Sequence, residues 1–421
     1  MSRERSSIPY VVGYDDPEVV VNAVSKAKVV VGIPSKDVAH TIAYVIHNVA
    51  KGLTKYFSGV DSVIVVSDGL SSDGTKDVVK VIRDYISVPT YILPNVRAPG
   101  KGSAIRLLVE LVSNYSDADA LILLDSDLRS ITPEWVAQLI NGAMDYGFVA
   151  PKYLRDRYDA TITNFIARPL TSATYGIDIS QPIGGDFGLC KSLVNELARS
   201  ELWVSNPWVS LFGVDIFITH TALAKGFKVC EANLGVKIHE AKDPSKALKN
   251  MFVEVVGSLI TLLAEYSDYW VRREVRKLIK PPVINEPQVP PMKPWGIKVS
   301  TEGVIKSFRE GLRMYLSTYE HVLNRELLNY IINELISKGL DREVWFRVIV
   351  EYIGSFLRRQ SIGYRTELLK SLIPLWMGRL LNYINEVKGL SDDEVQEVLN
   401  EEVMTFVKGR NLLREVIKKY A

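Results

Sequence analysis

Four short apolar runs alternate with amphipathic segments between residues 28 and 152, and this alternation restricts the possible folds more than any other feature. The runs at 28–34, 62–67, 89–93 and 120–124 are rich in Val, Ile and Leu, which is typical of buried strands. Helices are expected at about 38–57, 73–85 and 101–114, and again from Pro133, with Thr132 as N-cap. Solidly apolar strands between helices predict a mostly parallel α/β sheet with helices on both faces, a Rossmann-like arrangement. Ligands of such sheets bind at the carboxyl ends of the strands.

The rest of the chain is less regular and suggests a second, helical part. Helices are expected near 160–175 and 213–225, a strand at 228–232, and a long helix at about 245–278. Six prolines fall between Pro281 and Pro294, which indicates a linker. From Val304 to the end, apolar residues recur at helical spacing. We therefore predict an N-terminal extension (1–27), an α/β domain (28–280), a Pro-rich linker (281–300) and a C-terminal all-helical domain (301–421).

Composition excludes several classes of protein. The 51 basic residues nearly balance the 49 acidic ones, so the concentrated positive charge that binds nucleic acid is not expected. Cys190 and Cys230 are too few for a disulfide framework, which points to a reducing, cytoplasmic compartment. The longest apolar stretch, at 252–263, is interrupted by Glu254 and is shorter than the roughly 20 residues of a membrane span. We therefore expect neither a membrane span nor a nucleic-acid partner.

Asp125-Ser126-Asp127 is the strongest chemical signal, because it directly follows the apolar run at 120–124. Two carboxylates at the mouth of a strand can hold a divalent cation against a diphosphate. Asp-x-Asp alone is a weak pattern. The chain contains a second one, Asp117-Ala118-Asp119, which precedes the same strand and is expected to form a solvated turn. The position of the first pair predicts a metal site, with a plain strand-end turn as the alternative.

Three further positions are candidates for binding. His239 follows a strand and loop and is a possible third ligand, although a lone histidine is more often structural. Lys101 lies in a Gly-rich segment, 97–102, at the start of an expected helix, where it can meet a phosphate; a solvated loop is the alternative. Asp68 ends the second apolar run and can accept hydrogen bonds from a base or ribose, or simply form a turn with Gly69.

Several motifs occur in the order seen in retaining GT-A glycosyltransferases. They are Pro34, Ser67-Asp68-Gly69, Ser72-Asp73-Gly74-Thr75, Pro99-Gly100-Lys101-Gly102, Asp125-Ser126-Asp127 and Gln181-Pro182-Ile183-Gly184-Gly185. More narrowly, the chain resembles the glucosyl-3-phosphoglycerate synthase and mannosylglycerate synthase group. Ala167-Arg168-Pro169-Leu170 and the segment 233–240 are similar to the former, and the C-terminal region around Trp376 is similar to the latter. The resemblance implies a GT-A catalytic domain with a donor half at about 28–130 and an acceptor half at about 131–280.

The resemblance implies a donor and metal site. Asp127 and His239 are the implied protein ligands of Mg²⁺ or Mn²⁺, and Asp125 is expected near the metal and the ribose. Lys101 is expected to approach the nucleotide-sugar donor and to take part in catalysis, and Asp68 is expected at its base. The remaining implied donor-binding residues are Pro34, Ser35, Asp37 and Ser126.

The resemblance also implies an acceptor site. Asp215 matches an acidic residue placed beside the acceptor hydroxyl, where it is either a base or only positions the substrate. Gly184 and Gly185 match a segment whose backbone meets the sugar or the acceptor. Thr163 matches an acceptor-binding threonine, and Arg155 matches an arginine that holds a glycerate carboxylate.

Two departures from the family pattern concern the substrates. The glutamate of the donor site is replaced by Val38, and Asp37 is a possible substitute in base recognition. An arginine used for the acceptor phosphate is replaced by Thr161, which makes unphosphorylated glycerate more credible. Lys152, Arg155 and Arg157 are the cations that could compensate.

The expected function is transfer of glucose or mannose, with retention, from a GDP- or UDP-hexose to D-glycerate or 3-phosphoglycerate. The product would be a glycosylglycerate-type compatible solute or its phosphate precursor, and the family suggests a homodimer or higher homo-oligomer. One alternative is a GT-A transferase with another acceptor, such as a polyprenyl phosphate. A nucleotidyltransferase is a less favoured alternative, because it would need a Gly-rich loop directly after the first strand, and this chain has none there. A catalytically silent sugar-nucleotide-binding protein is also less favoured, because it would not need the metal ligands that this chain retains.

Overall fold

The computed structural model describes residues 9–238 and 247–420, which form two compact units. The first unit takes its residues from 1–154, 184–240 and 282–293, and the second from 155–183, 241–281 and 294–421. The units interleave along the chain because the segments 155–183 and 241–281 group with the C-terminal helices. The division into segments 1–27, 28–280, 281–300 and 301–421 stays a prediction.

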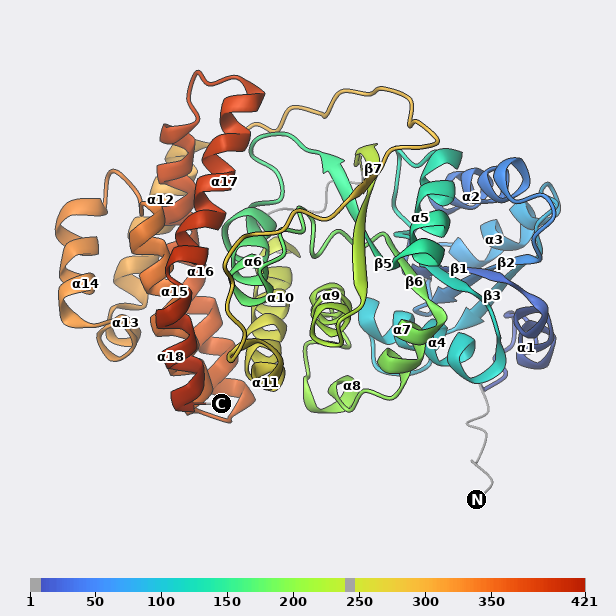
Figure 1. Cartoon of the computed structure of the whole chain (residues 1–421), viewed down its shortest axis with the longest axis horizontal. Coiled ribbons are helices and arrows are strands. Elements are labelled where there is room, and N and C mark those ends of the chain that lie inside the picture. Colours follow the sequence, from blue (N-terminus) through green and yellow to red (C-terminus); the bar gives the residue numbers. More distant parts are fainter. Residues whose placement is uncertain (1–8, 239–246, 421) are drawn as a thin grey trace. The chain divides into compact units, whose positions relative to one another are not determined.

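An eight-stranded sheet forms the framework of the first unit (Figure 1). The strand order is β3-β2-β1-β4-β6-β5-β7-β8, and every neighbouring pair is parallel except those of β6, which is antiparallel to both β4 and β5. The mostly parallel α/β fold is therefore confirmed. The strands are β1 (Val29–Ser35), β2 (Ser62–Asp68), β3 (Thr90–Pro94), β4 (Ala120–Leu123), β5 (Gly147–Leu154), β6 (Phe187–Cys190), β7 (Lys228–Val236) and β8 (Val283–Ile284).

Helices cover both faces of this sheet, as the apolar strands require. On one face α2, α3 and α5 pack over a core that includes Val31, Ile64 and Ile122 from the strands. On the other face α4 packs against β1 and β2, and α7 packs against β4 and β6. The helices of this unit are α1 (Pro17–Lys26), α2 (Ile42–Tyr56), α3 (Thr75–Arg83), α4 (Lys101–Tyr115), α5 (Pro133–Asp145), α7 (Lys191–Ala198), α8 (Leu202–Ser205) and α9 (Val214–Ala224).

Two strands of the sheet have weak sequence signals. β6 is only four residues long and includes Gly188, whose open side lies against the carbonyl of Leu139. β5 contains Pro151, and its last residues alternate between buried and exposed. Both strands are positioned by their neighbours, because β6 fills the space between β4 and β5.

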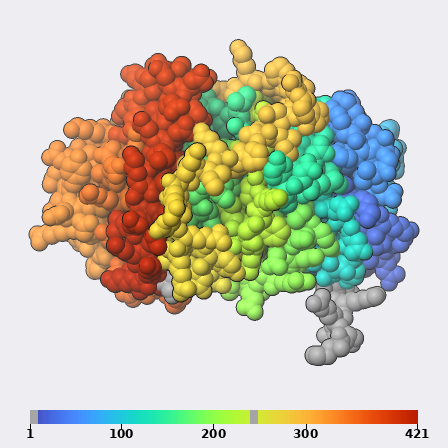
Figure 2. Space-filling view, viewed as in Figure 1, coloured from blue at the N-terminus to red at the C-terminus, as the bar shows by residue number. Residues whose placement is uncertain are grey.

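The second unit is helical, and Figure 2 shows its orange and red C-terminal helices packed into one continuous block. Its longest helix, α16, pairs with α12 and also contacts α10 and α15. The elements are a π-helical turn η1 (Thr163–Ala167), α6 (Arg168–Tyr175), α10 (Ala247–Glu265), α11 (Ser267–Trp270), α12 (Thr301–Met314), α13 (Leu316–Val322), α14 (Arg325–Tyr330), η2 (Ile331–Leu335), α15 (Arg342–Arg358), α16 (Ile362–Glu386), α17 (Asp392–Lys408) and α18 (Arg410–Tyr420). The predicted C-terminal helical region is confirmed.

The predicted long helix at about 245–278 is wrong beyond Glu265, where α10 ends. A single further turn, α11, follows, and the Trp270 indole N–H donates to the Leu263 carbonyl at 2.9 Å, which gives one carbonyl of the last turn a partner. Residues 272–280 are mostly charged and exposed, so a helix there would have no apolar face to bury. Across both described stretches of the chain, no helix is long and apolar enough to span a membrane.

Candidate active site

Polar residues follow several parallel strands of the first unit at their carboxyl ends. β1 and β2 end on Ser35 and Asp68, β4 ends two residues before Asp125, and β7 ends directly before Lys237. These four strands run in the same direction, so their carboxyl ends lie along one edge of the sheet. This edge is where open α/β sheets bind their ligands.

Asp125 lies between two lysines at this edge. One carboxylate oxygen, Oδ1, is 2.8 Å from Lys101 Nζ, and the other, Oδ2, is 2.7 Å from Lys237 Nζ. Burial alone would raise the pKa of Asp125, but the two ammonium groups hold this pKa well below its ordinary value. The ionised form of Asp125 is therefore favoured, and both of its oxygens already have cationic partners.

Lys237 and Asp186 complete this cluster, and neither is a predicted site residue. Lys237 Nζ lies 2.7 Å from Asp186 Oδ2 and donates to the Gly184 carbonyl at 2.8 Å. The other oxygen of Asp186 accepts from the backbone N–H of Asp125 at 2.8 Å, and Tyr153 Oη donates to Asp186 Oδ2. Their signal in the sequence is proximity: Asp186 directly follows Gly185, and Lys237 precedes His239 by two positions.

The start of α4 holds Lys101 in place by close backbone packing. The N–H of Gly102 donates to the Leu211 carbonyl at 3.1 Å, and a Cβ on Gly102 would lie 1.8 Å from the Val209 carbonyl oxygen. The N–H of Ser103 donates to Ser210 at 2.9 Å. Two amides of the first turn are thus already used, so the expected contact with a phosphate falls to the Lys101 side chain.

Asp215, in the first turn of α9, faces the same lysine. Its Oδ2 accepts from Lys101 Nζ at 2.9 Å. Its Oδ1 is buried and has no hydrogen-bond partner among residues 9–238 and 247–420. Burial raises the pKa of Asp215 to about 6, against the opposing effect of the Lys101 charge. An unpaired buried carboxylate oxygen is costly, and a substrate hydroxyl is the kind of donor that would satisfy it.

Gly185 lies against these charged groups in a left-handed conformation, with a φ of +85°. A Cβ at this position would lie 2.5 Å from Asp125 Oδ2 and 2.9 Å from Lys101 Nζ. Only glycine fits here without displacing the cluster. The structure therefore brings five predicted residues together: Lys101, Asp125, Gly184, Gly185 and Asp215.

The comparison with known families decides the class of this protein. Residues 25–261, more than half of the chain, match the family model of the glycosyltransferase domain of mannosylglycerate synthase. The chain belongs to this family. The predicted glycosyltransferase group is therefore confirmed.

Relatives of this glycosyltransferase include glucosyl-3-phosphoglycerate synthase of Petrotoga mobilis. That protein is 25% identical over 259 residues, which cover 57% of this chain and 74% of the relative. Among solved structures, glucosyl-3-phosphoglycerate synthase of Mycobacterium tuberculosis with Mn²⁺, UDP and glucosyl-3-phosphoglycerate matches at 21% identity and a TM-score of 0.45, over 58% of this chain and 82% of that one. The same enzyme with Mg²⁺ and UDP matches at 20% and 0.44, over 62% and 85%.

The loop that carries Asp127 in this glycosyltransferase is fixed from two sides. Thr41 Oγ1 donates to the Ser126 carbonyl at 2.9 Å, and the N–H of Arg129 donates to the Ile238 carbonyl at 2.8 Å. Within the part of the chain that the structure describes, no three His, Cys, Asp or Glu side chains form a ready metal site. His239 lies outside the described residues.

The donor set nevertheless suits a hard cation. Mg²⁺ is commonly held by one or two carboxylates together with substrate phosphates, and Mn²⁺ accepts the same oxygen ligands. Asp127 supplies such a carboxylate at the carboxyl end of β4. Both oxygens of Asp125 are paired with lysines, and the assignment of Asp127 as the metal ligand stays a prediction.

Asp68, the predicted base-binding residue, is fully buried and already accepts four hydrogen bonds. Tyr14 Oη and the N–H of Ser71 donate to its Oδ2 at 2.7 and 2.8 Å. Ser35 Oγ and Ser71 Oγ donate to its Oδ1 at 2.9 and 2.6 Å. A base could reach the Asp68 carboxylate only if one of these groups moved, so the assignment stays a prediction.

Of the other predicted donor residues, Pro34 and Ser35 end β1 and Asp37 lies in the turn that follows it. Pro34 is buried within the strand, whereas Asp37 is exposed and has a φ of +49°. Asp37 Oδ1 accepts from the N–H of Ser72 at 2.8 Å, and this hydrogen bond lowers the pKa of Asp37. Val38, which replaces the family glutamate, is buried and offers no polar group.

The predicted acceptor residues Arg155 and Thr163 belong to the second unit, and their role stays a prediction. Arg155 Nη1 pairs with Asp159 Oδ2 at 3.0 Å, and Thr163 begins the buried π-helical turn. Arg157, one of the cations considered for a phosphate, donates to the Leu390 carbonyl at 2.8 Å after α16. Arg157 is thus engaged in holding the helical unit together.

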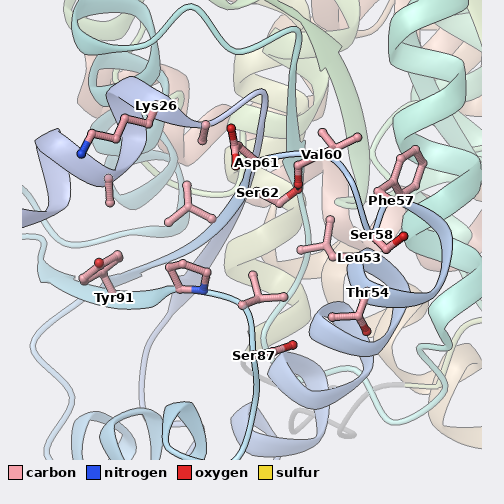
Figure 3. Close-up of a pocket in the computed structure, with 15 residues that line it drawn as sticks. Lys26, Leu53, Thr54, Phe57, Ser58, Val60, Asp61, Ser62, Ser87 and Tyr91 are labelled. Atoms are coloured by element: carbon pink, nitrogen blue, oxygen red, sulfur yellow. The ribbon is translucent and has the colours of Figure 1, made fainter.

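A separate hollow of about 410 Å³ lies at the opposite edge of the sheet, at the amino ends of β2 and β3 (Figure 3). Lys26, Phe57, Asp61 and Tyr91 are among its lining residues. None of the buried side-chain atoms without a hydrogen bond, among the described residues, belongs to this lining. Nothing in it matches the convergent charges of the other edge, which we take as the candidate active site.

Proposed function

We propose that this glycosyltransferase is a metal-dependent, retaining hexosyltransferase that moves glucose or mannose from a nucleoside-diphosphate sugar to a glycerate-type acceptor. The observation that carries the proposal is the buried contact of Lys101 with Asp125 and Asp215. This contact places a positive charge, for the diphosphate, beside a carboxylate that can accept a hydrogen bond from a substrate hydroxyl. The family name supports a glycerate acceptor, and the Petrotoga relative supports a phosphorylated glycerate.

Lys101 fits the role of holding the departing diphosphate. An ammonium group has three N–H donors, and two of them point to Asp125 and Asp215 within the described chain. The third remains for a phosphate oxygen of the donor. Burial alone would lower the pKa of Lys101, but the two carboxylates hold this pKa above its ordinary value, so the ammonium group stays charged during turnover. A fixed charge in a buried site stabilises negative charge that develops in the transition state.

Asp127 and His239 would hold Mg²⁺ or Mn²⁺ at the carboxyl end of β4, with Asp125 close by. The cation, when bound, neutralises the diphosphate as a Lewis acid. Asp215 Oδ1 is available to accept a hydrogen bond from a hydroxyl of the acceptor or of the transferred sugar. In this position Asp215 orients the hydroxyl for attack on the same face that the diphosphate leaves.

The surroundings of the cations considered for an acceptor phosphate favour an unphosphorylated acceptor. The family arginine is Thr161, and Arg157 is committed to the Leu390 carbonyl. Of the compensating cations, Lys152 is exposed and Arg155 is paired with Asp159. We therefore propose D-glycerate as the preferred acceptor and 3-phosphoglycerate as the second candidate.

The test is release of nucleoside diphosphate by the full chain with Mg²⁺ or Mn²⁺, using UDP- and GDP-hexoses crossed with D-glycerate and 3-phosphoglycerate. Asp127→Ala should abolish acceptor-dependent release, whereas Asp119→Ala, in the exposed Asp-x-Asp pair before β4, should leave it unchanged. Product stereochemistry by proton NMR tests retention. No acceptor-dependent release with any pair, despite measurable donor binding, would refute the glycerate acceptor. Equal activity in the two variants would refute the role of Asp127.

A further inference from the structure

Lys237 is surrounded by hydrogen-bond acceptors of the protein, which leave none of its N–H donors for a substrate. Its Nζ lies 2.7 Å from Asp125 Oδ2, 2.7 Å from Asp186 Oδ2 and 2.8 Å from the Gly184 carbonyl oxygen. These three acceptors match the three N–H donors of an ammonium group. The side chain is only 5% exposed. Lys237 is therefore buried and saturated, in contrast to Lys101, and its donors are directed at the protein.

The three acceptors belong to two different parts of the proposed site. Asp125 lies two residues after the end of β4, in the predicted donor and metal segment. Gly184 lies in the turn before β6, in the predicted acceptor segment, and Asp186 ends the same turn. Asp186 is itself fixed to the donor segment, because its Oδ1 accepts from the N–H of Asp125. Lys237 thus joins both segments to the end of β7 through one nitrogen atom.

The orientation of Asp125 depends on this arrangement. Its carboxylate is planar, so a Lys237 Nζ fixed on Oδ2 determines the direction in which Oδ1 points. Oδ1 in turn pairs with Lys101 Nζ at 2.8 Å. Lys101 also contacts Asp215, so a rotation of the Asp125 carboxylate would shift the lysine that faces the diphosphate.

We propose that Lys237 is a positioning residue for hexosyl transfer: its three-point contact with Asp125, Asp186 and Gly184 orients Asp125 and, through it, Lys101. The proposal rests on the proposed function. Lys237 acts through other residues and does not touch the substrate. The competing explanation is that Lys237 only balances the buried charge of Asp125 and Asp186.

Two charge-balanced sets of variants separate these explanations. Lys237→Arg keeps the positive charge but replaces a compact three-donor group by a planar fork. The double variant Lys237→Met/Asp186→Asn removes one positive and one negative charge together, and Asp186→Asn alone is its control. Both sets avoid the uncompensated buried carboxylates that would endanger the fold of Lys237→Met alone.

The measurements are kcat and KM for the active substrate pair, with thermal unfolding of every variant. We expect kcat and kcat/KM to fall together by about 100-fold in Lys237→Arg, with KM little changed, because a shift of about 1 Å at a catalytic group can cost that much. The double variant should remain at least about 30-fold below Asp186→Asn in kcat. Unfolding midpoints within a few degrees of wild type would show that the loss is not a loss of fold.

Recovery of the double variant to the kcat of Asp186→Asn, or a wild-type kcat in Lys237→Arg, would overturn the proposal and leave charge balance as the role of Lys237. A crystal structure of Lys237→Arg gives a readout that needs no turnover. A rotated Asp125 carboxylate with a displaced Lys101 supports the proposal, and unchanged positions overturn it. If the wild-type chain is inactive with every donor and acceptor pair, the proposed function fails, while the crystal structure still reports whether Lys237 positions Asp125.

Discussion

Replacement of Gly185 by alanine places one methyl group against the two charged side chains of the proposed site. Gly185 has a φ of +85°, and the added Cβ would lie 2.5 Å from Asp125 Oδ2 and 2.9 Å from Lys101 Nζ. Non-bonded heavy atoms meet at about 3.5 Å, so the Asp125 carboxylate must move by about 1 Å. Because two lysines hold this carboxylate, it cannot move without shifting them as well.

Two separate effects are expected in Gly185→Ala. The left-handed backbone costs a non-glycine residue about 1–2 kcal/mol, which lowers the free energy of unfolding by this amount. The displacement of Asp125 and Lys101 acts on the reaction, and a shift of about 1 Å in the catalytic groups corresponds to a loss of roughly 100-fold in kcat. The loss of activity should therefore be much larger than the loss of stability suggests.

Gly226→Ala is the matched control. Gly226 has a φ of +77° in the same unit, but a Cβ there would meet no atom within 4 Å. Both variants carry the same backbone strain, and the overlap with Asp125 in Gly185→Ala should lower its free energy of unfolding by about 1–3 kcal/mol more in urea titrations. Only Gly185→Ala should lose turnover in the nucleoside-diphosphate release assay. The reasoning is refuted if Gly185→Ala keeps more than about a third of the wild-type kcat, or if Gly226→Ala loses as much.

Two further predictions concern the buried charges of each unit. Because burial raises the pKa of Asp215 to about 6, its ionised form is disfavoured in the folded protein, and the associated cost to stability disappears as the pH falls from about 6 towards the ordinary value near 3.8. Activity should move in the opposite direction, because the carboxylate is the form that pairs with Lys101, so the reaction rate should fall below about pH 6. If Asp215→Asn retains a residual rate that still falls below about pH 6, the assignment of this titration to Asp215 is contradicted. In the helical unit, Arg379 and Glu402 are fully buried and 2.7 Å apart, so Arg379→Met should lower the free energy of unfolding by about 3–5 kcal/mol. Arg276→Ala, at an exposed pair, should stay within about 1 kcal/mol of wild type in the same denaturant titration, and equal losses would contradict the argument.

Local patterns in the sequence were enough to predict the framework of the first unit. The runs that became β1, β2 and β4 each contain at least four apolar residues, and the spacing of Ile42, Val45, Ile46 and Val49 predicts the buried face of α2. Such patterns arise from neighbours in the chain, so they can be read without knowing the fold. They also place Asp125 directly beyond a buried strand, which is why the Asp-x-Asp pair at 125–127 could be distinguished from the one at 117–119.

Contacts between distant parts of the chain could not be read in this way. β6 joins the sheet in the antiparallel direction, although its own four residues carry little strand signal. The long helix predicted at about 245–278 ends early, because residues 272–280 are mostly charged and exposed and give a helix no apolar face to bury. In both cases the environment, and not the local pattern, decides the conformation.

The same distinction applies to the site. The sequence by itself determined the family and the residue types at the carboxyl ends of the strands, since these depend on motifs and their order. Only the tertiary structure decided how the charges pair: Lys237 reaches Asp125 across 112 positions, Lys101 reaches Asp215 across 114, and Tyr14 reaches Asp68 across 54. Ion pairs and hydrogen bonds need their atoms within about 3 Å, and the chain reaches such distances between remote residues only after the sheet has formed.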